Sequence, residues 1–386
     1  MSTTYQQLCP VYFGAGAITE IGQKAKEFGA QKVFCVYDQG VKVSGIAERV
    51  IGYLREAGME VDTFDAVVPD APDTMVNEVG ARIHGQGYGL VVGVGGGSSM
   101  DTAKAISVLA DHPLPVKQYF ASNGGSPILD SQTKLILVPT ASGTGSEVTI
   151  MSVVHDTEKE SKEAVLRPAD LAIVDPELTM SAPPGITASS GLDALSHAVE
   201  AYTSVGCNPK DDLLALHAIG LIAGNLEAAY QDGANLTART ALSFASNIAG
   251  IAFSDASVHV GHCAAHEMGL KLHMPHGIAC AIATPVVIEF CADVLPDKTR
   301  QMAETLGVQV PADASAAETG KMAADAVRAL MRRVGIQSLR EQGHSRESVL
   351  DCARGAIENN WFHIMSPKPV DVDTMRILLA EMYDRY

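Results

Sequence analysis

The stretch LVVGVGGGSSMDTAKA, residues 90–105, decides the fold. Its first residues form the short apolar run of a buried strand, three glycines follow, and residues 101–110 have the spacing of a helix. A glycine turn at this place lets backbone N–H groups approach an anion, and the N-terminus of the helix favours phosphate. The stretch is neither a Walker A nor a G-x-G-x-x-G motif. A phosphate loop and a plain strand-to-helix turn are both compatible with it.

Strands and helices alternate on both sides of this stretch, through the first half of the chain. Such alternation predicts a parallel sheet with right-handed crossovers, and glycines at strand ends predict ligand loops at the carboxyl edge of that sheet. We expect strands at residues 32–37, 61–64, 90–94 and 135–138, and helices at residues 40–57, 76–85 and 101–110.

The second half of the chain has a different pattern. After Pro183-Pro184-Gly185, strand patterns almost vanish and long Ala/Leu/Ile segments show helical periodicity. We therefore predict an α/β domain over residues 1–184 and an all-helical domain over residues 185–386. Helices are expected at residues 192–202, 213–230, 238–252 and 316–334.

Composition limits the partners and the compartment. The chain has 28 Lys and Arg residues against 45 Asp and Glu, a net charge of −17, which argues against nucleic acid as a partner. No run of about 20 uninterrupted apolar residues is present, so we expect no membrane span. The seven cysteines are scattered and no pair forms C-x-x-C. This argues against a disulfide framework or a cysteine zinc site and favours the cytoplasm.

A second glycine loop follows the strand expected at residues 135–138. In PTASGTGSE, residues 139–147, small hydroxyl residues alternate with glycines and offer donors on a flexible backbone. Two such loops after parallel strands fit a ligand with two recognition ends, such as a dinucleotide. Taken alone, this loop would also fit a Ser/Thr-rich turn.

Asp38 stands at the end of the first expected strand. A carboxylate there accepts hydrogen bonds from ribose hydroxyls and repels a 2′-phosphate, which would favour NAD(H) over NADP(H). A helix N-cap or a surface turn would explain the same residue.

Histidines and one aspartate in the second half have the spacing of metal ligands. Asp193 and His197 lie four residues apart in an apolar segment, as do His262 and His266, and His276 follows soon after. Residues i and i+4 share one face of a helix, and a buried aspartate needs a partner or a metal. One carboxylate with three imidazoles suits Fe²⁺ or Zn²⁺. Any one of these histidines, taken singly, would more often be a satisfied core or surface residue.

Three stretches together resemble the iron-containing (group III) alcohol dehydrogenases. They are GGGSSMDTAKA from residue 95, PTASGTGSEVT from residue 139, and GLDALSHAVEAY from residue 191, followed by HCAAH and PHG. FGAGAITEIG and SPKPV also resemble family stretches, and the order holds across most of the chain. The resemblance implies an N-terminal Rossmann-like domain that binds NAD(P) and a C-terminal all-helical domain that binds the metal. Dehydroquinate synthases share this architecture.

The resemblance also implies roles for single residues. The metal ligands would be Asp193, His197, His262 and His276, with His266 beside them near the nicotinamide. In the coenzyme site, the pyrophosphate loop would consist of Gly95, Gly96, Gly97, Ser98 and Asp101. The second loop would consist of Thr140, Ser142 and Thr144. Lys162 would contact the coenzyme, and Asp38 would favour NAD.

Four positions depart from the family pattern without removing an implied ligand. Asp255 and His259 stand where Asn and Gly are common, Glu267 stands where Pro or Gln is common, and Cys280 replaces an Asn after the PHG motif. We interpret His259 as a surface histidine of a helix.

These features predict reversible hydride transfer between an alcohol and a nicotinamide, with Fe²⁺ or, second, Zn²⁺ as a Lewis acid on the substrate oxygen and His266 as proton relay. We expect a small, polar primary alcohol or aldehyde as substrate and a homodimer or larger homo-oligomer. The alternatives are a glycerol-dehydrogenase-like polyol oxidoreductase, a dehydroquinate synthase, a metal-dependent hydrolase and a non-catalytic nucleotide sensor. The paired glycine loops argue against the hydrolase, and the intact ligand set argues against the sensor.

Overall fold

The computed structural model describes residues 5–386, and contacts divide the chain into two compact units. The first unit comprises Gln7–Ala141 and Gly145–Ser181. The second comprises Ala182–Tyr386 together with residues 5–6 and Ser142–Thr144. Three residues of the second glycine loop therefore belong to the helical unit, although both flanks of that loop belong to the other unit.

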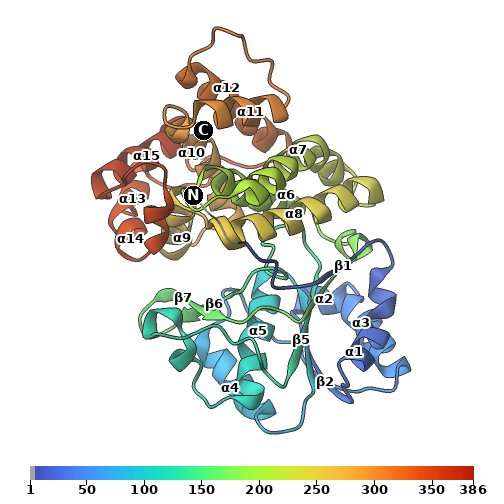
Figure 1. The fold of residues 1–386 in the computed structure, drawn as a ribbon. Coiled ribbons are helices and arrows are strands. Elements are labelled where there is room, and N and C mark those ends of the chain that lie inside the picture. Colours follow the sequence, from blue (N-terminus) through green and yellow to red (C-terminus); the bar gives the residue numbers. More distant parts are fainter. Residues whose placement is uncertain (1–4) are drawn as a thin grey trace. The chain divides into compact units, whose positions relative to one another are not determined.

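The first unit is built on a six-stranded, fully parallel sheet with the order β1-β8-β5-β4-β2-β3 (Figure 1). From β2 the chain runs outward to β3 and then returns to the other side of β2 to form β4. This reversal puts a topological switch point between β2 and β4, where parallel sheets bind ligands outside the carboxyl ends of their strands. The strands are β1 (Val11–Phe13), β2 (Lys32–Val36), β3 (Glu60–Phe64), β4 (Leu90–Gly95), β5 (Lys134–Pro139) and β8 (Leu171–Val174).

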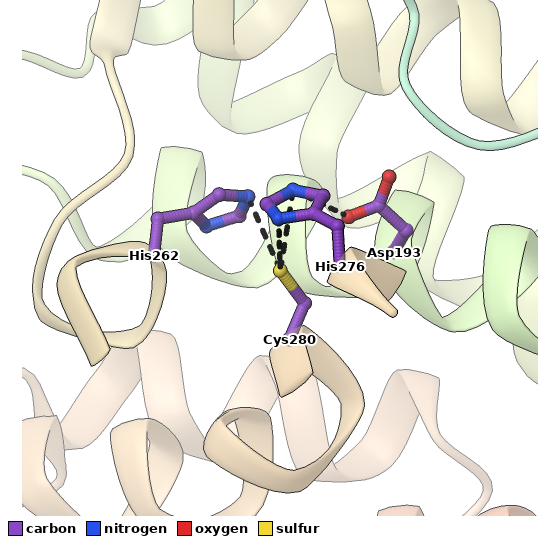
Figure 2. Close-up of side chains that lie close together, drawn as sticks. All are labelled: Asp193, His262, His276 and Cys280. Atoms are coloured by element: carbon purple, nitrogen blue, oxygen red, sulfur yellow. Dashed lines mark hydrogen bonds and ion pairs between the residues drawn. The ribbon is translucent and has the colours of Figure 1, made fainter. Parts of the chain in front are cut away.

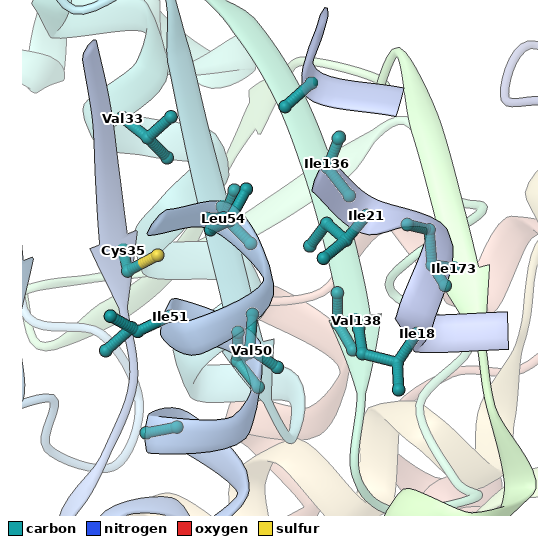
Figure 3. Close-up of a cluster of buried hydrophobic side chains, with 14 of the residues drawn as sticks. Ile18, Ile21, Val33, Cys35, Val50, Ile51, Leu54, Ile136, Val138 and Ile173 are labelled. Carbon is teal, nitrogen blue, oxygen red and sulfur yellow. The ribbon is translucent and has the colours of Figure 1, made fainter. Parts of the chain in front are cut away.

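Helices cover both faces of this sheet, because alternate side chains of its central strands are buried on each side. On one face, η1 (Ala17–Glu20), α1 (Ile21–Glu27) and α3 (Ile46–Glu56) pack against apolar side chains of five strands, some of which are drawn in Figure 3. On the other face, α5 (Gly97–Asp111) packs against β4 and β5, beside α4 (Asp73–Ile83). Strands buried on both faces are typical of parallel sheets.

Several elements of this unit differ from those expected. The single helix expected over residues 40–57 is two helices, α2 (Gln39–Val43) and α3, because Gly45 turns the chain with a φ of +77°. The strands β1 and β8 and the antiparallel hairpin of β6 (Met151–Asp156) and β7 (Ser161–Leu166) were not expected. Short 3₁₀ turns η2 (Val116–Tyr119), η3 (Ala121–Asn123) and η4 (Pro176–Thr179) complete the unit.

Close packing of α5 against β4 predicts that Gly93 is intolerant of a side chain. A Cβ on Gly93 would lie 2.6 Å from Cβ of Ala103 and 2.8 Å from Cδ2 of Leu137. Gly93→Ala should therefore lower the free energy of unfolding by about 1–3 kcal/mol through overpacking. Gly52→Ala on α3, where a Cβ meets nothing within 4 Å, should raise it by about 0.5–1 kcal/mol. Urea denaturation of both variants measures the difference, and equal stabilities would contradict the packing.

The second unit is helical throughout its described residues (Figure 1). Each of the four helices expected here is present, three of them longer at their N-termini than their apolar pattern suggested. Its elements are α6 (Pro184–Thr203), α7 (Pro209–Gln231), α8 (Leu236–Ala256), α9 (Val260–Leu272), α10 (His276–Cys291), α11 (Pro296–Thr305), α12 (Ala316–Arg333), α13 (Arg346–Leu350), α14 (Ala353–Glu358), η5 (Trp361–Met365) and α15 (Val372–Asp384).

One helix among residues 5–386, α7, is long and apolar enough to cross a membrane by length and composition alone. It packs against both α6 and α8, and Ala215, Ile219 and Ile222 are fully buried in these contacts. Packing within the helical unit accounts for the buried third of its most apolar window.

Candidate functional site

Three helices of the second unit bring four metal-binding side chains together (Figure 2). Asp193 comes from α6, His262 from α9, and His276 and Cys280 from α10. One donor atom of each lies within 4.8 Å of the donor atoms of the other three. Oδ1 of Asp193 is 3.5 Å from Nε2 of His276, and Sγ of Cys280 is 3.7 Å from Nε2 of His262. The structure therefore gathers three of the four predicted ligands and adds a thiol.

Two glycines let these helices approach one another closely. A Cβ on Gly277 would lie 2.4 Å from the carbonyl oxygen of Ser189, so this glycine lets the first turn of α10 lie against α6. A Cβ on Gly261 would lie 2.2 Å from Oε1 of Glu200 and would push α9 away from the same helix. The glycines beside His276 and His262 thus set the distances between the ligand-bearing helices.

His197, the fourth predicted ligand, lies at the edge of this group. Its Nε2 is 4.0 Å from Oδ1 of Asp193, and its ring stacks on Phe253 and on His262. Burial lowers the pKa of His197 to about 4, so the ring is neutral, the form in which imidazole binds a metal. Its role as a ligand stays a prediction.

Glu200 holds the ring of His262 in place from behind. Its Oε1 lies 3.0 Å from Nδ1 of His262, and Oε2 accepts a bond from the backbone N–H of His259. Burial would raise the pKa of Glu200, but His262 and His259 together lower it, so the carboxylate is ionised. Burial would likewise lower the pKa of His262, but Cys280 and Glu200 raise it well above its ordinary value. A carboxylate on one ring nitrogen orients the other nitrogen toward a metal.

His259 was expected at the surface, and this interpretation is wrong. The residue is fully buried, and its Nε2 lies 2.8 Å from Oγ1 of Thr203. It supports Glu200 from the N-terminus of α9, so its imidazole belongs to the buried polar network behind the candidate ligands.

His266 lies one turn beyond His262 on α9, outside the four-donor group. Its Nδ1 is 2.9 Å from Oδ1 of Asn360, and its ring centre is 5.4 Å from that of His276. Asn360 was missed in the sequence because it lies 94 positions away and belongs to no motif. The amide of Asn360 fixes the orientation of the His266 ring beside the candidate ligands.

In the first unit, Asp38 and the glycine turn that starts at Gly95 meet at the switch point between β2 and β4. Asp38 caps α2, because its Oδ1 accepts a bond from the backbone N–H of Val41 at 3.0 Å, while Oδ2 accepts one from Oγ of Ser99 at 3.1 Å. Gly95 has a φ of +147°, and a Cβ there would lie 2.6 Å from Oγ of Ser99. The N-cap alternative for Asp38 is thus confirmed, and its second oxygen still faces the glycine turn.

The glycine turn is shorter than the sequence suggested. Gly96 is the N-cap of α5, and Gly97 and Ser98 already lie in its first turn. The backbone N–H of Thr140 donates to the carbonyl of Gly95 at 3.0 Å, which places the start of the second loop beside this turn. Helix N-termini of this kind bind phosphate through their unpaired N–H groups and their dipole.

The remaining predicted coenzyme residues have structural partners. Asp101 accepts a bond from Oγ of Ser146 at 2.6 Å, and burial raises its pKa. Lys162 forms a 2.7 Å ion pair with Asp70. In the helical unit, Oγ of Ser142 lies 3.1 Å from Oγ of Ser243, and Thr144 belongs to the same unit.

Comparisons with known proteins find matches to both units of the chain. Residues 10–176 match the family description "Iron-containing alcohol dehydrogenase", and residues 187–383 match "Fe-containing alcohol dehydrogenase family, C-terminal". The chain belongs to the iron-containing alcohol dehydrogenase family. This membership confirms the predicted family, the predicted fold class and the predicted reaction class, an oxidoreductase that acts on CH–OH groups.

Several relatives are named for small polar compounds, and one, of Geobacillus thermodenitrificans, is named a long-chain-alcohol dehydrogenase. A choline dehydrogenase of Bacillus subtilis is 34% identical over 92% of this chain and 89% of its own length. A 1,3-propanediol dehydrogenase of Klebsiella pneumoniae is 36% identical over 86% of each chain. The structure of a sulfoacetaldehyde reductase from Bifidobacterium kashiwanohense in complex with NAD⁺ has a TM-score of 0.88 and 28% identity, and covers 100% of both chains.

The contact between Glu200 and His262 predicts that Glu200 supports metal binding without being a ligand. Glu200→Gln keeps the size of the side chain but removes its charge. We expect metal affinity, measured by competition with a chelator, to fall roughly 10–100-fold, as for other outer groups of metal sites. Glu289→Gln, on a carboxylate of α10 that pairs with Arg328 instead, is the matched control and should leave affinity unchanged. Unaltered affinity in Glu200→Gln would contradict this role.

The position of Asp38 predicts an effect on coenzyme choice. Asp38→Asn retains an oxygen for the α2 cap but removes the charge that would repel a 2′-phosphate. We expect the ratio of kcat/KM for NADP⁺ to that for NAD⁺ to rise about tenfold, equivalent to 1.4 kcal/mol. Asp62→Asn on β3, whose carboxylate bonds to the hydroxyl of Tyr88, is the control. An unchanged ratio in Asp38→Asn would count against this role.

Proposed function

We propose that this protein is a metal-dependent, NAD(H)-linked alcohol dehydrogenase or aldehyde reductase that acts on a small, polar primary alcohol or aldehyde. The observation that carries the proposal is the donor group of buried Asp193, buried His262 and half-buried His276 on three packed helices. Glycerol-dehydrogenase-like oxidation of a polyol is the alternative within the same chemistry.

The donor group fits a divalent metal ion. Within residues 5–386, Oδ1 of Asp193 is buried without a hydrogen-bond partner, a costly arrangement for a polar atom in an apolar surrounding. A cation would satisfy the carboxylate oxygen. We propose Asp193, His197, His262 and His276 as the ligands and Fe²⁺, with Zn²⁺ second, as the ion.

The switch point of the first unit fits a dinucleotide. The unpaired N–H groups at the start of α5 suit a pyrophosphate, and Asp38 beside the turn suits a ribose with a free 2′-hydroxyl. We propose NAD(H) as the favoured coenzyme, with Gly95, Gly96, Gly97 and Ser98 around the pyrophosphate. Asp101, Thr140, Ser142, Thr144 and Lys162 are assigned to the same coenzyme site.

The residues of the chain supply positioning and proton transfer. When bound, the metal supplies a Lewis acid for the substrate oxygen, and the nicotinamide supplies or accepts a hydride. Asp193, His262 and His276, with His197 at their edge, would hold the ion. Asn360 accepts a bond from Nδ1 of His266, which leaves Nε2 as the basic nitrogen that takes up or returns the proton of the substrate hydroxyl.

The state of the cysteines bears on the location of the protein. All seven cysteines are free, and six of them are buried, which favours a reducing compartment, and we propose the cytoplasm. Resemblance to the family leads us to propose a homodimer or a larger homo-oligomer. Choline, 1,3-propanediol and sulfoacetaldehyde, named for three relatives, are small and polar, whereas a fourth relative is named for long-chain alcohols.

Anaerobic purification, metal analysis and an NADH-coupled panel of small aldehydes and ketones test the proposal. We expect one equivalent of iron or zinc per chain and a loss of NADH absorbance with at least one small polar aldehyde. A metal-dependent hydrolase or a nucleotide sensor would leave NADH unconsumed. Metal-containing protein that oxidises no NADH across the panel, and reduces no NAD⁺ with the matching alcohols, would overturn the proposal.

His266→Ala separates proton transfer from metal binding in the same assay. We expect the variant to keep its metal, because His266 lies outside the donor group, and to lose roughly 10²–10⁴-fold in turnover, as is typical for the removal of a general acid–base residue. Loss of the metal from this variant would instead make His266 a ligand or its structural support.

A further inference from the structure

Cys280, which stands where Asn is common after the PHG motif, lies among the proposed ligands. Its Sγ is 3.5 Å from Nε2 of His276 and 3.7 Å from Nε2 of His262 (Figure 2). The side chain is 1% exposed. Cys280 is also the one cysteine in the donor group found among residues 5–386, while the other buried cysteines have no place in it.

Helix geometry explains why the thiol faces the site. His276 and Cys280 are four residues apart in the first turns of α10, so they project from the same face of that helix. Gly277 lets this face lie against α6, which carries Asp193. The thiol and the carboxylate of Asp193 therefore both approach Nε2 of His276, each at 3.5 Å.

The distances between donor atoms match those around a single ion. Two ligands of a tetrahedral zinc ion lie about 3.5 Å apart when their bonds are about 2.0 and 2.3 Å long, the values for nitrogen and sulfur. The two sulfur–nitrogen distances and the 3.5 Å distance from Asp193 to His276 are close to this value. A plain thiol–imidazole hydrogen bond would explain one such distance but not three that converge.

The unpartnered oxygen of Asp193 is the independent observation that points to a ligand at this place. Asp193 is 2% exposed, and its Oδ1 has no hydrogen-bond partner in the part of the chain that the structure describes. The same oxygen faces Nε2 of His276, whose ring also contacts Cys280. A cation within this group would bind the oxygen and the sulfur together.

We propose that Cys280 is itself a metal ligand, so that the ion is held by oxygen, nitrogen and sulfur rather than by oxygen and nitrogen alone. The inference rests on the proposed function, because it assigns a further ligand to the same ion. Thiolate is a soft ligand, and its presence shifts the preference of a site toward Zn²⁺ and away from ions that prefer oxygen and nitrogen.

X-ray absorption at the metal edge of the zinc-loaded, full-length protein tests the proposal directly. We expect a sulfur neighbour at about 2.3 Å in addition to nitrogen and oxygen neighbours at about 2.0–2.2 Å. Cys280→Ser should lose the sulfur neighbour. Cys291→Ser, at a buried cysteine on the same helix, should retain it. Cobalt-loaded samples give a second readout, since a thiolate–cobalt charge-transfer band should be present in the wild type and absent in Cys280→Ser.

Zinc affinity supplies a measure that does not depend on turnover. We expect Cys280→Ser and Cys280→Asn to lower Zn²⁺ affinity at least roughly tenfold, the lower end of the loss seen when a supporting group of a metal site is removed. Circular dichroism of each variant checks that the fold is retained. Cys291→Ser should match the wild type.

The outcomes separate this inference from the proposed function. A zinc shell of nitrogen and oxygen alone in the wild type, or a sulfur neighbour that persists in Cys280→Ser, overturns the role of Cys280 and leaves the dehydrogenase proposal standing. Protein that binds no metal overturns both. Metal with a sulfur neighbour but no NADH oxidation supports Cys280 as a ligand and overturns only the proposed reaction.

Discussion

The arrangement of the candidate ligands in the helical unit depends on one buried carboxylate, that of Asp193, whose Oδ1 has no hydrogen-bond partner among the described residues. Asp193 is surrounded on α6 by the apolar residues Leu192 and Leu195, both fully buried or nearly so. An ionised carboxylate in such a place is costly unless a positive charge lies next to it. His276 of α10 faces this oxygen, and the buried network of Glu200 and His259 orients His262 of α9 beside it.

Small residues make this arrangement possible. Gly277 and Gly261 stand next to His276 and His262 in the sequence. A Cβ on Gly277 would clash with the backbone of α6, and a Cβ on Gly261 would clash with the carboxylate of Glu200, which α6 carries. Gly191 on α6 allows close packing against α7, because a Cβ there would lie 2.4 Å from Cδ1 of Leu226. The abundance of glycine in the metal motifs is therefore explained by helix packing as much as by chemistry.

Sequence patterns predicted what depends on local spacing and missed what depends on distant contacts. The i, i+4 pairs on α6 and α9 and the strand–glycine–helix unit were visible because their residues are neighbours in the chain. The pair of His276 and Cys280 has the same spacing, but Cys280 was noted only as a departure from the family pattern and not as a ligand. Glu200 and Asn360 could not be assigned to their histidines, because those contacts join residues 62 and 94 positions apart. The break between α2 and α3 depends on one glycine in a left-handed conformation.

The short segment Ser142–Thr144 has a consequence for dissecting the protein. It belongs to the helical unit, yet the chain enters it from Ala141 and leaves it to Gly145, both of which belong to the sheet unit. A fragment that starts at Ala182 would lack these residues, and Ser243 would lose the hydroxyl of Ser142. Neither half of this protein is a contiguous piece of chain, so gene truncation at a single junction cannot isolate a complete unit.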